Sequence, residues 1–349
     1  MKITEPQEQL TEMQKLFITG PKQAAFHDVE SPVCAPDGVV VRARLTAIST
    51  GTELRVFRAV PVDEAGRFLH ENLPFQLPAE NGYSMVGDVI EVGADVDGVA
   101  TGDRVYVPAS HSQFAAVSAA NVTALPDVIP DEEAVMLSIL EVGHRALRQG
   151  DPPAGANVAV IGQGVIGLAL TAFADAFGFR TAVLDMSPER LQIARKMGVL
   201  VAAHATDSDA IHQIRDLFGG EGADVAFEAT SHWSGIRTAM EMTRTDGKVV
   251  VVSRNTSVPD FNPVGHPFLG KRLNLMTSYG HPAPGCRWSC DRTSALTIDL
   301  LARRRLKIAP MLTHRFSWEE IPEVYRRMDA ADHSIVGAII DWPAGDGTG

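Results

Sequence analysis

Val158-Ala-Val-Ile-Gly-Gln-Gly-Val-Ile-Gly-Leu168 is the stretch that decides the fold of this chain. Its first four residues, Val158 to Ile161, are all aliphatic and predict a buried strand, and the apolar residues that follow the stretch predict a helix. Gly162, Gly164 and Gly167 lie between them and fit the pattern G-x-G-x-x-G. The first glycine allows a tight turn, the second lets backbone amides approach a pyrophosphate, and the third lets helix and strand pack closely.

The next apolar run ends in an acidic residue. Residues 181–184 predict a second strand, and Asp185 follows it, 23 residues after Gly162. A carboxylate there can accept hydrogen bonds from an adenosine ribose. Asp185 can also cap a helix that begins near Pro188, and the two roles are compatible. The order of strand, glycines, helix, strand and acid predicts a dinucleotide site with these members: Gly162, Gly164, Val165, Ile166, Gly167 and Asp185.

The acidic residue also bears on the choice of cofactor. A carboxylate at Asp185 would repel the 2′-phosphate of NADP, and no arginine follows it directly. Arg190, five residues further on, is expected to reach the same ribose from the next helix. The sequence therefore favours NAD as the cofactor.

Length, charge and cysteine content limit the class of protein. A chain of 349 residues is expected to form two domains. Its net charge of −12 argues against nucleic acid as a partner, because phosphate binding needs a concentrated basic surface. No apolar stretch is long enough to span a bilayer, and residues 1–16 do not resemble a signal peptide. The three cysteines give no disulfide framework, which favours a reducing, cytoplasmic setting.

The hydrophobic pattern changes along the chain. Residues 13–130 predict short strands broken by glycine and proline, as in an all-β barrel-like module, with examples at 39–45, 87–93 and 103–107. A helix is expected over 131–149. From residue 158 strands alternate with helices, which indicates a parallel doubly wound sheet. The expected strands are 158–161, 181–184, 224–228, 248–253 and 273–277, with helices near 189–197, 208–218, 233–243, 294–304 and 318–328 and a last strand at 336–341.

This arrangement resembles the medium-chain dehydrogenase/reductase superfamily over nearly the whole chain. The residues that support the resemblance are Gly82-Tyr-Ser-Met-Val-Gly-Asp-Val-Ile-Glu-Val-Gly93, Gly102-Asp-Arg-Val105, the glycines at 162–167 and Gly337-Ala-Ile-Ile-Asp-Trp342. The resemblance implies an α/β fold with a GroES-like β-barrel catalytic domain at 1–140 and 305–349, and a Rossmann NAD-binding domain at 141–304. It also places Val142 against the nicotinamide and Ser253 among the residues that bind the cofactor.

Many members of that superfamily hold a catalytic zinc ion, and this chain departs from their pattern at each ligand position. The expected cysteine of a C-G-T-D-like segment is Thr50, the expected histidine of a G-H-E motif is Tyr83, and the third ligand falls near Ser138. Neutral hydroxyls are poor zinc ligands, so we expect no metal. The alternative is a distorted site that uses Glu53, Glu80, Glu141 or His144.

The segments Ser-Thr-Gly-Thr-Glu and Pro-x-x-x-Gly-Tyr-Ser resemble a zinc-free branch that includes bacteriochlorophyllide a dehydrogenase and dehydrogenases of sugars, polyols and cyclitols. Without zinc, the hydroxyl proton and the developing alkoxide need organic hydrogen-bonding groups. Five residues are candidates for these roles: Thr50, Thr52, Glu53, Tyr83 and His144.

Each candidate also has a structural interpretation. Tyr83 can be a core aromatic, and Thr50 and Thr52 can be caps in a glycine-containing turn. Glu53 is either the base or a residue that orients its neighbours, with Arg55 as a possible partner. His144 is either a proton carrier or a packing residue.

Two further segments each have two possible roles. His111 lies in a predicted loop that can face the site, and residues 278–285 form either part of the substrate wall or an ordinary surface turn.

The leading hypothesis is an NAD-dependent, zinc-independent dehydrogenase of a secondary alcohol, either a polyol, a sugar derivative or a cyclitol. The alternatives are a zinc-free NAD(P)H-dependent reductase of quinones or enones, and an NAD-binding protein without turnover. The aliphatic strand at 248–253 suggests a sheet that extends across a homodimer or homotetramer, although an ordinary central strand has the same pattern. The expected partner is a small-molecule substrate, not nucleic acid or a membrane.

Overall fold

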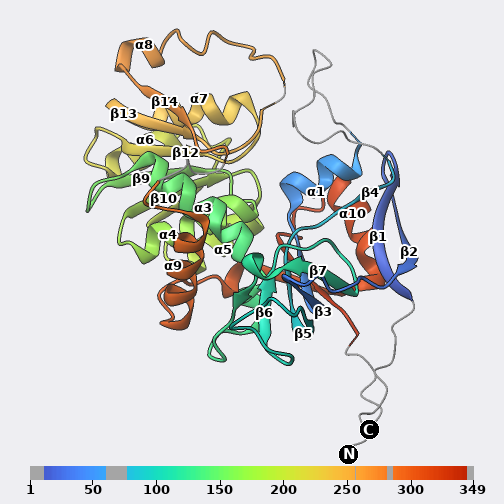
Figure 1. Ribbon diagram of the computed structural model, residues 1–349. Helices are drawn as coiled ribbons and strands as arrows, with labels where there is room; N and C mark the ends of the chain where they lie inside the picture. The colour runs from blue at the N-terminus through green and yellow to red at the C-terminus, as the bar shows by residue number, and fades with distance from the viewer. Residues whose placement is uncertain (1–11, 60–76, 256, 281–285, 344–349) are drawn as a thin grey trace, which may run out of the picture.

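A computed structural model of the protein describes residues 12–59, 77–255, 257–280 and 286–343. It has two halves that lie side by side (Figure 1). One half combines the first and last parts of the chain, drawn blue, cyan and red. The other half contains the middle of the chain, drawn green to orange.

The first half is built mainly from antiparallel strands around an apolar core, with one parallel pair, β15 and β16. A three-stranded sheet has the order β2-β1-β4, and a larger sheet has the order β15-β16-β3-β5-β6-β8, with β7 paired to β3. The strands are β1 Glu12–Gly20, β2 Gln23–Glu30, β3 Gly38–Ile48, β4 Ala79–Glu80, β5 Met85–Val92, β6 Arg104–Val107, β7 Phe114–Ser118, β8 Thr123–Ala124, β15 Leu312–Ser317 and β16 Gly337–Asp341. Strand β16 returns from the far end of the chain and pairs with β3, which closes this half.

Two helices of the first half pack against each other beside these sheets. Helix α1, Thr50–Phe57, buries Leu54 and Phe57, and the Phe57 ring lies 5.3 Å from Tyr325 of α10, Ile321–Asp329. The sequence predicted a glycine-containing turn at α1. A helix forms instead because the burial of Leu54 and Phe57 outweighs the low helix propensity of threonine and glycine.

The second half is a six-stranded parallel sheet in the order β11-β10-β9-β12-β13-β14. Its strands are β9 Asn157–Ile161, β10 Arg180–Asp185, β11 Val201–His204, β12 Ala223–Glu228, β13 Thr243–Val251 and β14 Asn274–Thr277. The strand order reverses between β9 and β12. In open α/β sheets, ligands bind at the carboxyl ends of the strands beside such a reversal.

Helices connect the parallel strands and join the two halves. They are α2 Asp131–Ala134, α3 Leu137–Gly150, α4 Val165–Ala176, α5 Pro188–Lys196, α6 Ala210–Leu217, α7 Trp233–Met242, α8 Phe268–Lys271 and α9 Cys290–Ala302; short 3₁₀ turns lie at Ala119–Asn121, Ala309–Met311 and Trp318–Glu320. The apolar core around α3 and α4 includes Leu45 and Val86 from the first half, so the halves share packed residues.

The structure corrects several expected elements. The helix predicted over 131–149 is divided at Val135 and Met136, both fully buried, into α2 and α3. Strands β11 and β15 were not expected. The strand predicted at 248–253 is β13, which lies between β12 and β14, so the suggestion that this strand joins two subunits is wrong. In the part of the chain that the structure describes, no helix combines the length and apolar character needed to cross a membrane.

Candidate active site

The glycine-rich loop between β9 and α4 leaves room for a phosphate. Gly162 has a φ of +92°, which favours glycine. A Cβ atom on Gly167 would lie 1.9 Å from the carbonyl oxygen of Gly162, so only glycine fits there. A Cβ atom on Gly164 would meet nothing within 4 Å. Val165 is buried and Ile166 half-buried at the start of α4. The open space therefore lies at the positive end of that helix, where a pyrophosphate fits.

Asp185 fixes the backbone around this loop. Its Oδ2 accepts a hydrogen bond of 2.5 Å from the Gln163 amide, and its Oδ1 accepts one of 2.8 Å from the Ser187 amide. The N-cap of α5 is Ser187, whose Oγ accepts from the Arg190 amide, so the cap lies two residues after the one we expected. A carboxylate offers about four acceptor sites, so Asp185 keeps capacity for a ribose.

The Arg190 side chain is directed to another segment. Its Nε donates to the carbonyl oxygen of His333 at 3.3 Å, which links α5 to the chain just before β16. The expected contact of Arg190 with the ribose therefore stays a prediction.

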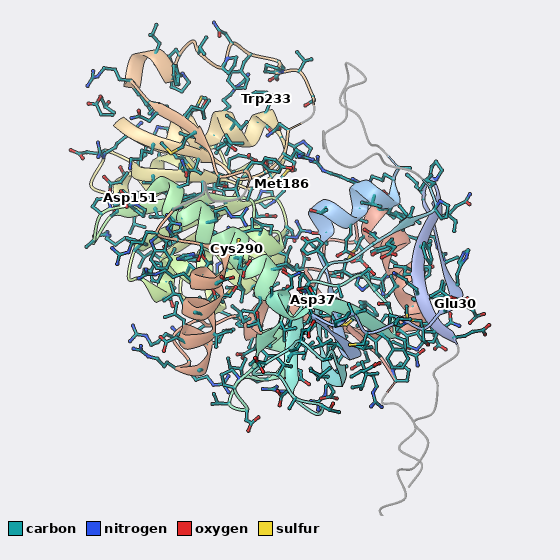
Figure 2. All side chains as sticks on the ribbon, viewed as in Figure 1. Glu30, Asp37, Asp151, Met186, Trp233 and Cys290 are labelled. Atoms are coloured by element: carbon teal, nitrogen blue, oxygen red, sulfur yellow. The ribbon has the colours of Figure 1, made fainter. Side chains whose placement is uncertain are left out.

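In Figure 2, Met186, the residue after Asp185, lies on the side of the parallel sheet that is turned towards the first half.

A buried carboxylate organises the ends of β12 and β13. Glu228 is fully buried, and its Oε1 accepts hydrogen bonds from the Thr230 amide, the Thr230 hydroxyl and the Ser231 amide. Its Oε2 accepts a hydrogen bond of 2.5 Å from Ser253. Glu228 was not among the expected site residues, although an acid that ends an apolar strand was a usable signal in the sequence. Val142, the residue expected to pack against the nicotinamide, is half-buried on α3.

Hydroxyl groups gather at the start of α1. The Tyr83 hydroxyl donates a hydrogen bond to Ser49 Oγ, and the Thr52 hydroxyl lies beside the same phenol. Burial raises the pKa of Tyr83, so this phenol is protonated at neutral pH. Thr50, the first residue of α1, is half-buried next to Ser49.

A second set of hydroxyls continues from the first. Tyr106 and Ser138 share a hydrogen bond, Ser84 donates to the Val135 carbonyl, and the Tyr106 hydroxyl lies 3.4 Å from Ser84 Oγ. Burial raises the pKa of Tyr106 to about 12. We call the residues of both sets the hydroxyl cluster: Ser49, Thr52, Tyr83, Ser84, Tyr106 and Ser138. The sequence indicated Tyr106 only as part of the strand expected at 103–107.

The hydroxyl cluster includes two of the positions where the resemblance to zinc-containing dehydrogenases implies a zinc ligand. The three positions that correspond to the zinc ligands are Thr50, Tyr83 and Ser138, and the last two are hydrogen bonded to other hydroxyls. Among residues 12–59, 77–255, 257–280 and 286–343, no three His, Cys, Asp or Glu side chains gather as metal ligands would. The residues present therefore do not fit a tetrahedral zinc site.

Glu53 lies behind the hydroxyl cluster in a buried network. Its Oε1 accepts from the Ser49 amide at 2.7 Å, and its Oε2 accepts from Tyr325 at 2.5 Å and lies 3.0 Å from His111 Nε2. His111 Nδ1 in turn lies 2.7 Å from Thr46 Oγ1. Glu53 is fully buried, so it orients its neighbours and is not positioned as a general base.

Two expectations about this network are wrong. Arg55 does not pair with Glu53: its Nη2 donates to the carbonyl oxygen of Arg254 at 2.6 Å, in the other half of the molecule. His111 lies in a loop between β6 and β7, as expected, but it does not face the site, because its ring is fully buried between Glu53 and Thr46.

His144 lies apart from the hydroxyl cluster. Its ring packs 5.2 Å from Phe173 and 5.2 Å from Trp288, and its Nδ1 is buried without a hydrogen-bond partner among the described residues. Burial, and then the charge of Arg148, lower its pKa to about 4. The expected role of His144 as a proton carrier has no support in this geometry, because the ring is neutral and enclosed by aromatic groups.

A surface groove of about 1200 Å³ lies beside β3, β6 and β8, away from the glycine-rich loop. Its walls carry several arginines, but Arg44 pairs with Asp88 and Asp131, and Arg315 pairs with Asp341. Arg44 and Arg315 are therefore already neutralised by neighbouring carboxylates and add little attraction for a charged ligand.

The fold and these sites define a class of protein. Residues 35–127 match the family described as alcohol dehydrogenase GroES-like domain, and residues 165–282 match the family described as zinc-binding dehydrogenase. The chain belongs to the medium-chain dehydrogenase/reductase superfamily. This confirms the predicted fold class, a GroES-like domain with a Rossmann-type parallel sheet.

The chain is similar to several dehydrogenases whose names give different substrates. The chain is 25% identical to L-threonine 3-dehydrogenase from Chelativorans sp. (strain BNC1), over 95% of this chain and 100% of that protein. It is 26% identical to sorbitol dehydrogenase from Bacillus subtilis (strain 168), over 73% of this chain and 79% of that protein. The crystal structure of 2R,3R-butanediol dehydrogenase from Bacillus subtilis has a TM-score of 0.81 and 21% identity, and covers 95% of this chain and 100% of its own.

Proposed function

We propose that this protein is a zinc-independent, NAD-dependent dehydrogenase that interconverts a secondary alcohol and its ketone. The substrate class is a polyol, a sugar derivative or a cyclitol. The single observation that carries the proposal is the hydroxyl cluster, in which Tyr83 and Ser138, the residues expected at two of the zinc-ligand positions, are hydrogen bonded to other hydroxyls. A site lined by hydroxyls suits a substrate with several hydroxyls of its own.

The position of the hydroxyl cluster supports this assignment. Helix α1 carries Thr52, and Arg55 on the same helix contacts the carbonyl of Arg254, one residue after Ser253. The start of α1 therefore faces the carboxyl end of β13. A substrate between them has Tyr83 on one side and the end of the cofactor site on the other.

Bound NAD would supply the hydride acceptor opposite the carbinol carbon. The chain itself handles the proton. The Tyr83 oxygen accepts the substrate hydroxyl proton while its own proton passes to the Thr52 hydroxyl beside it, and Thr52, which is exposed, releases its own proton to solvent. In the reverse direction the protonated phenol donates to the ketone oxygen.

The cofactor preference rests on Asp185. Its carboxylate lies at the carboxyl end of β10, beside the glycine-rich loop, and both of its oxygens are held by backbone amides. A fixed negative charge there favours the ribose hydroxyls of NAD over the 2′-phosphate of NADP.

The test is a turnover panel with purified protein. Polyols, sugar derivatives and cyclitols are offered with NAD and with NADP, and enones with NADH and NADPH; the absorbance of the reduced nicotinamide is followed. We expect oxidation of at least one polyhydroxy alcohol with NAD, at a rate that prolonged dialysis against a chelator leaves unchanged. Reduction of enones alone, or one tightly bound transition metal whose removal abolishes turnover, would overturn the proposal.

A further inference from the structure

Arg55 presents a guanidinium group where the two halves meet. It extends from α1, and its Nη2 donates to the carbonyl oxygen of Arg254 at 2.6 Å. Its Nη1 is buried and has no hydrogen-bond partner within the described part of the chain. A buried donor without a partner is costly, because it has lost its hydrogen bonds to water and gained none in return. The Arg55 side chain is therefore short of an acceptor in this state of the protein.

A second guanidinium lies close by. Arg254 stacks over the Tyr279 ring, with its Cζ 4.5 Å from the ring centre, and donates a hydrogen bond to the Tyr279 hydroxyl. Burial, and then the positive charge of Arg254, lower the pKa of Arg55. Two cations that repel each other at a half-buried position favour an anion between or beside them.

The place of Arg55 in the fold excludes the cofactor pyrophosphate as that anion. Arg254 follows β13, whereas the glycine-rich loop follows β9, and β12 lies between these strands. Neighbouring strands are about 4.8 Å apart, so the two positions are separated by about 10 Å along the sheet. Arg55 also lies three residues after Thr52, on the same side of α1. It therefore faces the position of the substrate in the proposed function.

We propose that Arg55 determines specificity by binding an anionic group, a carboxylate or a phosphate monoester, on the alcohol substrate. This inference rests on the proposed function for the identity of the substrate, and it narrows the class to acidic or phosphorylated polyhydroxy compounds. The Nη1 group supplies the hydrogen bond and Arg254 adds positive charge. A neutral polyol leaves the Nη1 group without an acceptor.

The first experiment measures binding without turnover. The NAD-saturated protein is titrated calorimetrically with inorganic phosphate and, separately, with D-gluconate. We expect one of these probes to bind, and Arg55→Met to weaken its affinity about 10- to 100-fold, the effect of losing one charge-assisted hydrogen bond. Arg55→Lys should retain part of the affinity. Absence of binding by both probes, or equal affinity in wild type and Arg55→Met, overturns the inference.

The matched control is Arg58→Met. Arg58 lies one residue beyond α1, is exposed, and pairs with Asp329 at 2.6 Å, so this variant removes the same charge from the same region without touching the site. It should bind the probes as wild type does. Equal losses in both variants would mean that general charge, and not Arg55, attracts the anion, which contradicts the inference.

The second experiment separates this inference from the proposed function. Oxidation of glucitol, glucitol 6-phosphate and gluconate with NAD is compared in wild type and Arg55→Met. We expect an acidic compound to have the highest kcat/KM, and Arg55→Met to raise KM for that compound only. Turnover of glucitol with no preference for either acid overturns the inference and leaves the proposed function standing. If a probe binds in a way that depends on Arg55 but no alcohol is oxidised, the proposed function is overturned and Arg55 remains an anion-binding residue.

Discussion

Tyr83 occupies a position where relatives with zinc are expected to have a ligand, and its phenol is hydrogen bonded to Ser49. In Tyr83→Phe the ring remains and only the hydroxyl is lost. We expect kcat to fall about 10²- to 10³-fold, as when one transition-state hydrogen-bond donor is removed, while KM changes little. Steady-state kinetics with the best alcohol would measure this. An unchanged kcat would assign Tyr83 to packing alone.

The ionisation of Tyr83 sets the pH dependence of the reverse reaction. Because burial raises the pKa of this phenol above its usual value of 10.0, it keeps its proton throughout the neutral range. Ketone reduction should therefore hold its rate up to about pH 10 and decline beyond it. A decline centred near neutral pH would point to a different proton donor.

Asp185 gives a prediction about the cofactor. Asp185→Asn removes the charge and leaves only one acceptor oxygen for the amides of Gln163 and Ser187. We expect the Kd of NAD to rise about tenfold, equivalent to about 1.4 kcal/mol, and the bias against NADP to shrink. Fluorescence titration of both cofactors measures this. Glu189→Gln, which removes an exposed charge four residues away, is the control and should leave both affinities unaltered.

His144 is predicted to affect stability in acid and not catalysis. Its pKa is 6.5 in the unfolded chain and about 4 in the folded protein. Between these values the unfolded chain binds a proton that the folded protein does not, so stability falls as the pH falls from 6.5 to 4, by up to about 3 kcal/mol. His144→Leu should remove this dependence in urea unfolding and keep kcat. Loss of turnover in a folded His144→Leu protein would restore the catalytic interpretation.

At the scale of elements, Glu53 connects α1 to α10 and to the segment before β7. Glu53→Gln keeps the shape of the side chain, but weakens the hydrogen bonds from the Ser49 amide, Tyr325 and His111. We expect a loss of about 1–3 kcal/mol in the free energy of unfolding. A double-mutant cycle with Tyr325→Phe should show coupling of about 0.5–3 kcal/mol. If the losses in the free energy of unfolding are additive in the double mutant, Glu53 and Tyr325 do not stabilise the protein through a shared interaction.

Some elements could be predicted from the sequence because their pattern is local. The strand β9, the glycines and α4 follow from the apolar run and the G-x-G-x-x-G spacing alone. Helix α1 could not be predicted in this way. Its helical state depends on the packing of Phe57 against Tyr325, a residue far along the chain. The same distance hid the partners of Glu53 and Arg55, since nothing local indicates that they contact Tyr325 and Arg254.

At the scale of the whole molecule, the sequence indicated the two halves but not which strand forms the edge of the parallel sheet. That edge depends on strand order, and strand order is not a local property. The structure places β14 at one edge and β11 at the other. Asn274, Leu275 and Thr277 of β14 are exposed, and Leu275 has 39% of its surface accessible.

An exposed apolar edge strand favours pairing with another chain. We therefore expect two copies to join through β14 into a homodimer that elutes, in size-exclusion chromatography with light scattering, at twice the 37.5 kDa chain mass. Leu275→Lys places a charge in that edge and should give a monomer. Leu200→Lys places the same charge beside β11 at the opposite edge, where Leu200 is also exposed, and should remain a dimer. If Leu200→Lys dissociates instead, the subunits pair through β11, and a monomeric wild type would exclude both arrangements.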